Sequence, residues 1–187
     1  MTDPTRVAGS GELADGSIVT WTVAEGRRGR RWREVIARDG STVHALLFET
    51  DAARRFSHLE LARTDGLWTF HPEPDGSLHG NQVSADGPIR HVQGWPFAMG
   101  DALLIEGSPI AAAALAWGHA REVAIGGSIK LSGVVVRSDG ELERIERTDL
   151  ARLDETRWRV GEGMFVEVDE LGLPILAGGR RQPLEEP

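Results

Sequence analysis

Three of the six histidines in this chain lie within one short stretch, from His71 to His91. The same region continues through Trp95-Pro96-Phe97 to Glu106, so large aromatic rings stand close in sequence to titratable groups. Aromatic rings with a few convergent polar groups are typical of a ligand cavity. The side chains that we expect to contact a ligand are Trp68, His79, Asn81, Trp95, Phe97 and Trp117.

A histidine beside a carboxylic acid can transfer protons. His91 is the candidate histidine, and Glu106 or Asp86 is the candidate acid. If Glu106 is buried beside the aromatic rings, the loss of hydration would raise its pKa. In the alternative interpretation, Trp95 and Phe97 fill an ordinary core and Glu106 is a solvated loop residue.

A metal site is a weaker interpretation of the same histidines. His71 and His79 could face each other across the Asp75-Gly76 hairpin, with Glu73 or Asp86 as a third ligand. No two histidines have the i, i+2 spacing that one face of a strand provides. Surface imidazoles are the simpler explanation, and we predict no metal site. The chain also lacks a nucleophile elbow, a phosphate-binding loop, a dinucleotide fingerprint and a zinc-protease motif, so we expect no cofactor.

Composition narrows the function classes. The 187 residues include no cysteine, which excludes disulfides, zinc–thiolate sites, iron–sulfur clusters and cysteine nucleophiles. The formal net charge of −8 argues against nucleic-acid binding, although a basic cluster at Arg27-Arg28 and Arg30-Arg31 could contact an anionic head group. We find no signal-peptide pattern and no apolar stretch long enough to span a membrane, so we expect a cytoplasmic protein.

The elements that position these residues are predicted to be strands. Asp-Gly, a preferred pair in type I′ hairpin turns, occurs six times between short runs of alternating polarity. This pattern predicts a mostly β fold: an antiparallel curved sheet that forms a half-barrel or a barrel. A strand over 122–137 is expected to bend at Gly126-Gly127. We predict a single domain over 1–177 and a disordered tail over 178–187, because the tail is polar and rich in glycine and proline.

One segment departs from the strand pattern. Ser108 is suited to cap a helix, Pro109 to its first position and Gly118 to its end. The residues between them are apolar on all sides, so this short helix over 109–117 should be buried. It could fill the concave side of the sheet or simply complete a core.

The order of these motifs resembles the glycolipid-binding family of bacterial β-rich half-barrel proteins. The resemblance is loose and covers roughly 19–174, from the Val-Thr-Trp-Thr-Val strand at Val19 to Leu173. It departs from the family pattern at Ala98-Met99-Gly100 and at Pro174-Ile175-Leu176. Membership would imply a half-open β fold around a hydrophobic cavity, with lipid or glycolipid binding inferred from that shape. The family brings no catalytic residues to this chain.

The leading hypothesis is a protein that binds an apolar or amphiphilic small molecule, such as a lipid or glycolipid, in a β-lined cavity. His79, Asn81, His91 and Glu106 would orient its polar head. The alternative is a cofactor-free isomerase, cyclase or hydrolase that uses the His91–carboxylate pair in the same cavity. A third interpretation is an interaction module with a dry core. The sequence leaves open the ligand, the closure of the barrel and the oligomeric state, a homodimer included.

Overall fold

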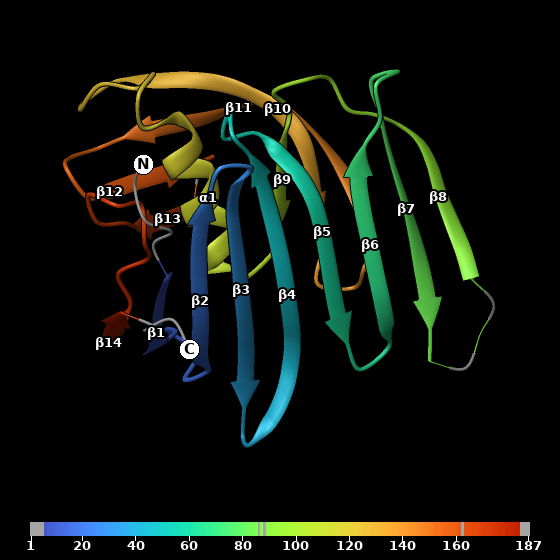
Figure 1. The fold of residues 1–187 in the computed structure, drawn as a ribbon, viewed down its shortest axis with the longest axis horizontal. Helices are drawn as coiled ribbons and strands as arrows, with labels where there is room; N and C mark the ends of the chain where they lie inside the picture. The colour runs from blue at the N-terminus through green and yellow to red at the C-terminus, as the bar shows by residue number, and fades with distance from the viewer. Residues whose placement is uncertain (1–5, 86, 88, 162, 184–187) are drawn as a thin grey trace. The chain divides into compact units, whose positions relative to one another are not determined.

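The computed structural model of the protein describes residues 6–85, 87, 89–161 and 163–183. The chain forms two compact units. The first unit contains the residues up to Phe97 and those from Leu176 onward, and the second runs from Ala98 to Ile175. In Figure 1 the strands of the first unit run from blue to green, with β14 in red. The prediction of a single domain over 1–177 stays a prediction.

The first unit is built on a nine-stranded sheet in which all neighbouring strands are antiparallel. The strand order is β14-β1-β2-β3-β4-β5-β6-β7-β8, so consecutive strands are neighbours, and the last strand of the chain lies beside the first. The strands are β1 (Arg6–Glu12), β2 (Ile18–Gly26), β3 (Gly29–Arg38), β4 (Ser41–Asp51), β5 (Phe56–Arg63), β6 (Gly66–Pro72), β7 (Ser77–Ser84), β8 (Ile89–Pro96) and β14 (Ala177–Pro183).

The hairpin turns of both units depend on aspartate in two ways. At Asp39-Gly40 both residues have positive φ, 50° and 76°, as a type I′ turn requires. At the other described Asp-Gly pairs only the glycine has positive φ, so these pairs do not have type I′ geometry. Asp15, Asp75 and Asp139 instead accept a hydrogen bond from the backbone N–H two residues later, at 2.9–3.0 Å. This side-chain bond stabilises the turn without a left-handed aspartate.

The second unit contains a five-stranded sheet that curls into a half-barrel, in the order β13-β12-β11-β10-β9 (Figure 1). Only β9 and β10 are parallel among these neighbours, and helix α1 (Pro109–His119) connects them. A parallel pair needs such a crossover because the chain must return to the end of the sheet where the first strand began, which a tight turn cannot do. The strands are β9 (Ala102–Ile105), β10 (Ser128–Val136), β11 (Leu142–Arg152), β12 (Arg157–Val160) and β13 (Met164–Glu167).

Helix α1 begins where the sequence predicts. The Ser108 hydroxyl oxygen accepts a hydrogen bond from the Ala111 N–H at 3.0 Å, and Pro109 is the first helical residue. The helix is buried and contacts β9 and β13. Its predicted end at Gly118 was wrong, because the chain stays right-handed through His119 to Ala120, where φ is −61°. The Ala120 N–H, rather than a left-handed glycine, caps the helix by bonding to the Trp117 carbonyl.

Two further segments differ from the sequence-based prediction. Part of the expected disordered tail forms β14, which pairs with β1 up to Pro183; residues 184–187 lie outside the described part. Every β14 residue is exposed, so main-chain hydrogen bonds order this strand and its side chains give no apolar pattern. The strand expected over 122–137 starts only at Ser128, because Gly126 turns at φ 80° and bonds to the Arg152 carbonyl.

The fold class is as the sequence predicts: mostly β, with antiparallel pairing dominant, a curled half-barrel sheet and one short helix. The single helix of the described residues, α1, is much too short to cross a membrane.

Candidate functional site

Buried and exposed residues alternate along the strands of the nine-stranded sheet. The side of the sheet that carries the buried residues is here called the apolar face. Strand register places five of them in a single row across β2 to β6. Each is at most 3% exposed. In strand order, the row consists of Trp21, Glu34, Leu46, Leu61 and Trp68. A carboxylate thus stands in the middle of an otherwise hydrophobic surface.

Glu34 has a titratable partner on the same face. His44 of β4 stands opposite Ile36, the next residue after Glu34 on this face of β3, and its Nε2 donates a hydrogen bond to Glu34 Oε1 at 2.8 Å. The exposed fractions of Glu34 and His44 are 1% and 7%. A buried carboxylate is tolerated in an apolar environment when a hydrogen-bond partner compensates for lost hydration. The pair therefore places acid–base groups and hydrogen-bonding atoms on the apolar face.

The two tryptophans at the ends of the row carry buried polar groups. Within the described residues, the indole Nε1 atoms of Trp21 and Trp68 have no hydrogen-bond acceptor. They stand four strand spacings apart, roughly 19 Å along the sheet. The Trp21 ring lies against Gly9 so closely that a Cβ there would be 2.2 Å from its Cζ2 atom. The Arg63 guanidinium lies over the Trp68 ring at 5.2 Å from its centroid.

Aromatic rings continue along the apolar face. The Phe56 ring centroid lies 5.3 Å from that of Phe48 and 5.7 Å from that of Phe97. Phe97 is buried, as is Trp68, and half-buried Trp95 stands opposite Leu78 in the register of β7 and β8. Three predicted ligand contacts, Trp68, Trp95 and Phe97, thus belong to this side of the sheet.

The predicted polar contacts belong to the opposite side, here called the polar face. His79 and Asn81 alternate with Leu78 and Gly80 on β7, so they point away from the apolar face. Asn81 stands opposite His91, whose Nδ1 donates a hydrogen bond to Asn81 Oδ1 at 2.7 Å. The structure therefore joins His79, Asn81 and His91 on one face and separates them from Trp68.

The remaining predicted contact, Trp117, lies in the second unit. It is buried near the end of α1, and its ring packs on Gly172. A Cβ at Gly172, where φ is 75°, would be 2.5 Å from Trp117 Cδ1. Glycine at this position therefore permits both the backbone turn and the close approach of the indole.

The described residues of the predicted acid–base group belong to different units, and each has a partner within its own unit. His91 bonds to Asn81 in the first unit, whereas Glu106 belongs to the second unit and Asp86 lies outside the described residues. The condition for a raised pKa at Glu106 is not met, because this side chain is only half-buried. The Ser138 N–H donates to Glu106 Oε2 at 2.6 Å, and this hydrogen bond, with the Ser138 hydroxyl, lowers the pKa of Glu106 below its ordinary value.

The histidine pair considered for a metal is present as a cross-strand pair. His71 stands opposite His79, with ring centroids 6.4 Å apart. His71 Nε2 also bonds to Glu73 Oε1 at 2.9 Å. Within the described part of the chain, no group of three potential ligands could hold a metal ion.

Sequence reasoning missed Glu34, His44 and Trp21 as site residues, although a signal for them exists. Glu34 alternates with Trp32 and Ile36, so strand periodicity alone places its carboxylate among apolar side chains. His44 alternates in the same way with Leu46 and Phe48. A polar residue in the apolar phase of a strand is thus the pattern that identifies this site.

Three hollows in the first unit are lined by other residues. They border β1 to β5 and β14, with volumes of about 280, 640 and 290 Å3. Arginine is prominent in all three linings, and none of the three includes a predicted ligand contact. The hollows therefore mark a second feature of the unit, separate from the tryptophan row.

Comparison with known proteins gives one structural similarity. No family model matches the chain, and no curated protein matches it. The fold is similar to the crystal structure of a DUF1089 family protein from Pseudomonas aeruginosa, with a TM-score of 0.47 and 18% sequence identity. The match covers 94% of this chain and 90% of that chain.

Proposed function

We propose that the protein binds an apolar or amphiphilic small molecule, of lipid or glycolipid type, on the apolar face of the nine-stranded sheet. The observation that carries this proposal is the pair of buried indole N–H groups at Trp21 and Trp68 that lack acceptors within the described residues. They end the row that also contains Glu34.

The energetic argument rests on the cost of a buried donor without a partner, about 1–3 kcal/mol for each group. Buried polar groups in folded proteins nearly always have partners, and we propose that an acceptor from outside the chain pairs with these two indoles, which lie in one row. A ligand with hydroxyl, carbonyl or ester oxygens would supply such acceptors. Its hydrocarbon part would contact side chains such as Leu46 and Leu61 between the tryptophans.

The Glu34–His44 pair adds directional contacts for a polar head. A carboxylate accepts hydrogen bonds, and an imidazole can donate or accept according to its tautomer. Sugar and glycerol hydroxyls can use both kinds of contact. The resemblance of the motif order to the glycolipid-binding family supports the same ligand class.

Native mass spectrometry of the purified protein tests the proposal first. We expect a co-purified species whose mass identifies a lipid or another amphiphile. A brominated fatty acid, which quenches tryptophan fluorescence on contact, provides a defined probe. Quenching that saturates with probe concentration supports binding, whereas an empty protein whose emission ignores the probe overturns it.

Two conservative variants test the role of the indole N–H groups. Trp21→Phe and Trp68→Phe keep an aromatic ring but remove the donor, so each should weaken probe binding about fivefold. Trp158→Phe, which removes an indole from β12 in the second unit, is the matched control and should bind as the parent does. Equal losses in all three variants would contradict the assigned site.

A second candidate function is favoured by the buried Glu34–His44 contact, which could supply a proton donor and acceptor beside a bound ligand. This is the cofactor-free enzyme alternative, moved from His91 and Glu106 to a pair that is in contact. Incubation of the parent protein with the lipid fraction that co-purifies with it should then change the mass or isomeric form of a component. Glu34→Gln should abolish that change while the ligand still binds.

A further inference from the structure

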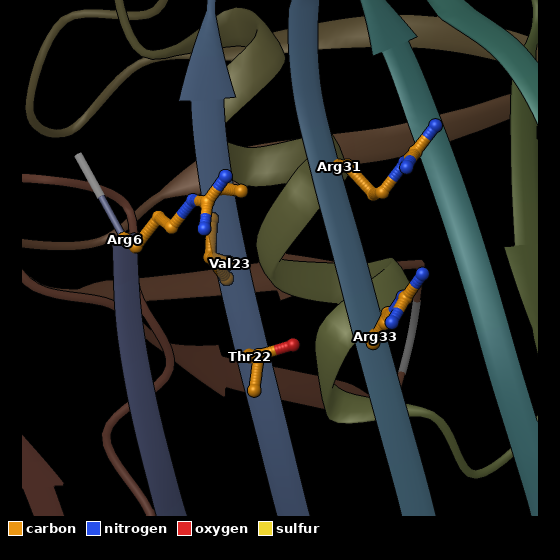
Figure 2. A pocket seen from close by; sticks show the side chains of 6 residues that line it. Arg6, Thr22, Val23, Arg31 and Arg33 are labelled. Atoms are coloured by element: carbon orange, nitrogen blue, oxygen red, sulfur yellow. The ribbon is translucent and has the colours of Figure 1, made fainter. Parts of the chain in front are cut away.

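The polar face of β1, β2 and β3 contains a hollow of about 280 Å3 rich in arginine. Figure 2 shows Arg6 reaching from β1 across β2, and the Thr22 hydroxyl pointing from β2 toward β3. Arg31 and Arg33 extend from β3 toward β4. None of the described residues that line this hollow is acidic.

Strand register explains how the hollow forms. Ala24 stands between Arg6 on one side and Arg31 on the other, so a methyl group separates two long cationic side chains. Thr22 stands opposite Arg33 in the neighbouring row of the same face. The short side chains of Ala24 and Thr22 thus form a low floor with guanidinium groups on both sides.

The charges around this floor are incompletely neutralised. Arg31 Nε bonds to Glu49 Oε1 at 2.5 Å. Arg6 and Arg33 are exposed, and neither has a carboxylate partner in the described part of the chain. An adjoining hollow of about 640 Å3 shares Arg6, Ala24 and Arg31. Together the two linings contain six arginines and three carboxylates, in a chain whose formal net charge is −8.

We infer that this hollow binds a phosphate-type oxyanion between Arg6 and Arg33, with the Thr22 hydroxyl as an additional donor. The planar guanidinium group matches the oxygens of a phosphate with two parallel hydrogen bonds. Arg33 can turn back over β3 because no carboxylate among the described residues holds it beside β4. The phosphate could belong to a soluble compound or to a phospholipid head group, since both present the same oxygens.

This site is independent of the proposed apolar-ligand site. Thr22 lies between Trp21 and Val23, and Arg33 lies between Trp32 and Glu34, so the two sites use alternate residues of the same strands. Alternate residues point to opposite faces of a sheet. A molecule bound on the apolar face cannot place its head group in the hollow, and either proposal can fail without the other.

Binding measurements with two probes test the inference. Inorganic phosphate is titrated by calorimetry, and vesicles of phosphatidylglycerol are compared with vesicles of phosphatidylcholine by co-sedimentation. Saturable phosphate binding assigns the hollow to soluble phosphate compounds. Binding to phosphatidylglycerol vesicles without measurable phosphate binding assigns it to lipid head groups. Binding of neither probe overturns the inference.

Matched variants separate a built site from a general charge effect. Arg33→Gln and Arg6→Gln should each weaken binding about tenfold, because each removes a charge-assisted contact. Arg33→Lys keeps the charge but loses the paired donors, so its loss should be intermediate. Arg90→Gln, an equal charge change on exposed β8 five strands from β3, should bind as the parent does. An equal loss in Arg90→Gln would overturn the site, and unchanged circular dichroism shows that each variant is folded.

Discussion

The two faces of the nine-stranded sheet come from alternate residues of the same strands, yet charged side chains are buried and paired on one face and exposed on the other. On the apolar face, Glu34 is buried and bonded to His44. On the polar face, Arg31 meets Glu49 near solvent, while Arg6 and Arg33 lack carboxylate partners in the part described. A charge that is buried must be matched by the protein, whereas an exposed charge is matched by water. Charged residues therefore need a partner within the protein on the apolar face, whereas on the polar face they stay available for the anion proposed above.

The largest effect is expected when a substitution breaks the buried Glu34–His44 pair. Glu34→Leu leaves the His44 imidazole without its partner and should lower the free energy of unfolding by about 3 kcal/mol in urea denaturation. The double variant Glu34→Leu/His44→Phe replaces both polar groups by apolar ones and should recover most of that loss. If the double variant loses more unfolding free energy than Glu34→Leu and His44→Phe lose when added together, the broken pair is not the reason for the loss.

The next effect concerns the space beside Trp21. Gly9→Ala places a methyl group 2.2 Å from the present position of the Trp21 ring, so the indole must move. We expect a loss of about 1–3 kcal/mol in unfolding free energy and a shift of the tryptophan emission. Gly26→Ala is the matched control, because Gly26 ends β2 with open space around its Cα. Equal losses in the two variants would argue against a tightly packed apolar face at β1.

A smaller effect is expected on the polar face. Arg31→Gln removes the contact with Glu49, but both groups are partly solvated, so the unfolding free energy should fall by less than about 1 kcal/mol. This difference should shrink further when salt is added, because salt screens exposed charges. A loss comparable to that of Glu34→Leu would contradict the conclusion that the buried pair stabilises the sheet more than the exposed pair does.

The smallest effect extends the comparison to the second unit, where Glu106 is stabilised by a backbone donor in a solvated position. Its pKa is lower in the folded protein than its ordinary value of 4.5, first because the Ser138 N–H bonds to the ionised form. The resulting stability is present above pH 4.5 and is lost as the pH falls through the lower folded pKa. In Glu106→Gln the unfolding free energy should therefore fall less steeply as the pH is lowered into the acid range. Its dependence on pH near neutrality should be unchanged. A Glu106 pKa above 4.5, measured by NMR, would contradict this.

Much of the fold follows from local patterns in the sequence. Alternation in β2 and the helix signals at Ser108 and Pro109 depend on neighbouring residues, so one sequence suffices to predict them. Strand β9 was missed because all four of its residues are buried, which removes alternation. Strand β14 was missed for the opposite reason, since all its residues are exposed. Both strands are specified by their partners rather than by their own pattern.

The candidate site was predictable only in part. Large aromatic residues are usually buried, and Trp68 and Phe97 are both buried on the apolar face, while their contact with a ligand stays a prediction. His79 and Asn81 were grouped with them through proximity in sequence, but strand parity sends neighbouring residues to opposite faces. Glu106 follows an apolar run that forms β9, and the chain leaves the strand before reaching it. Proximity in sequence was therefore a poorer guide than the phase of each strand.

The pairing of β14 with β1 has a consequence for biosynthesis. The two strands are neighbours in the sheet, but the entire second unit and seven other strands of the first are translated between them. Contacts between such distant segments close large loops and form late. Until β14 has been translated and pairs with it, β1 exposes an unpaired edge of the kind that recruits strands from other chains. Shielding this nascent edge is a task for which a chaperone would be suited.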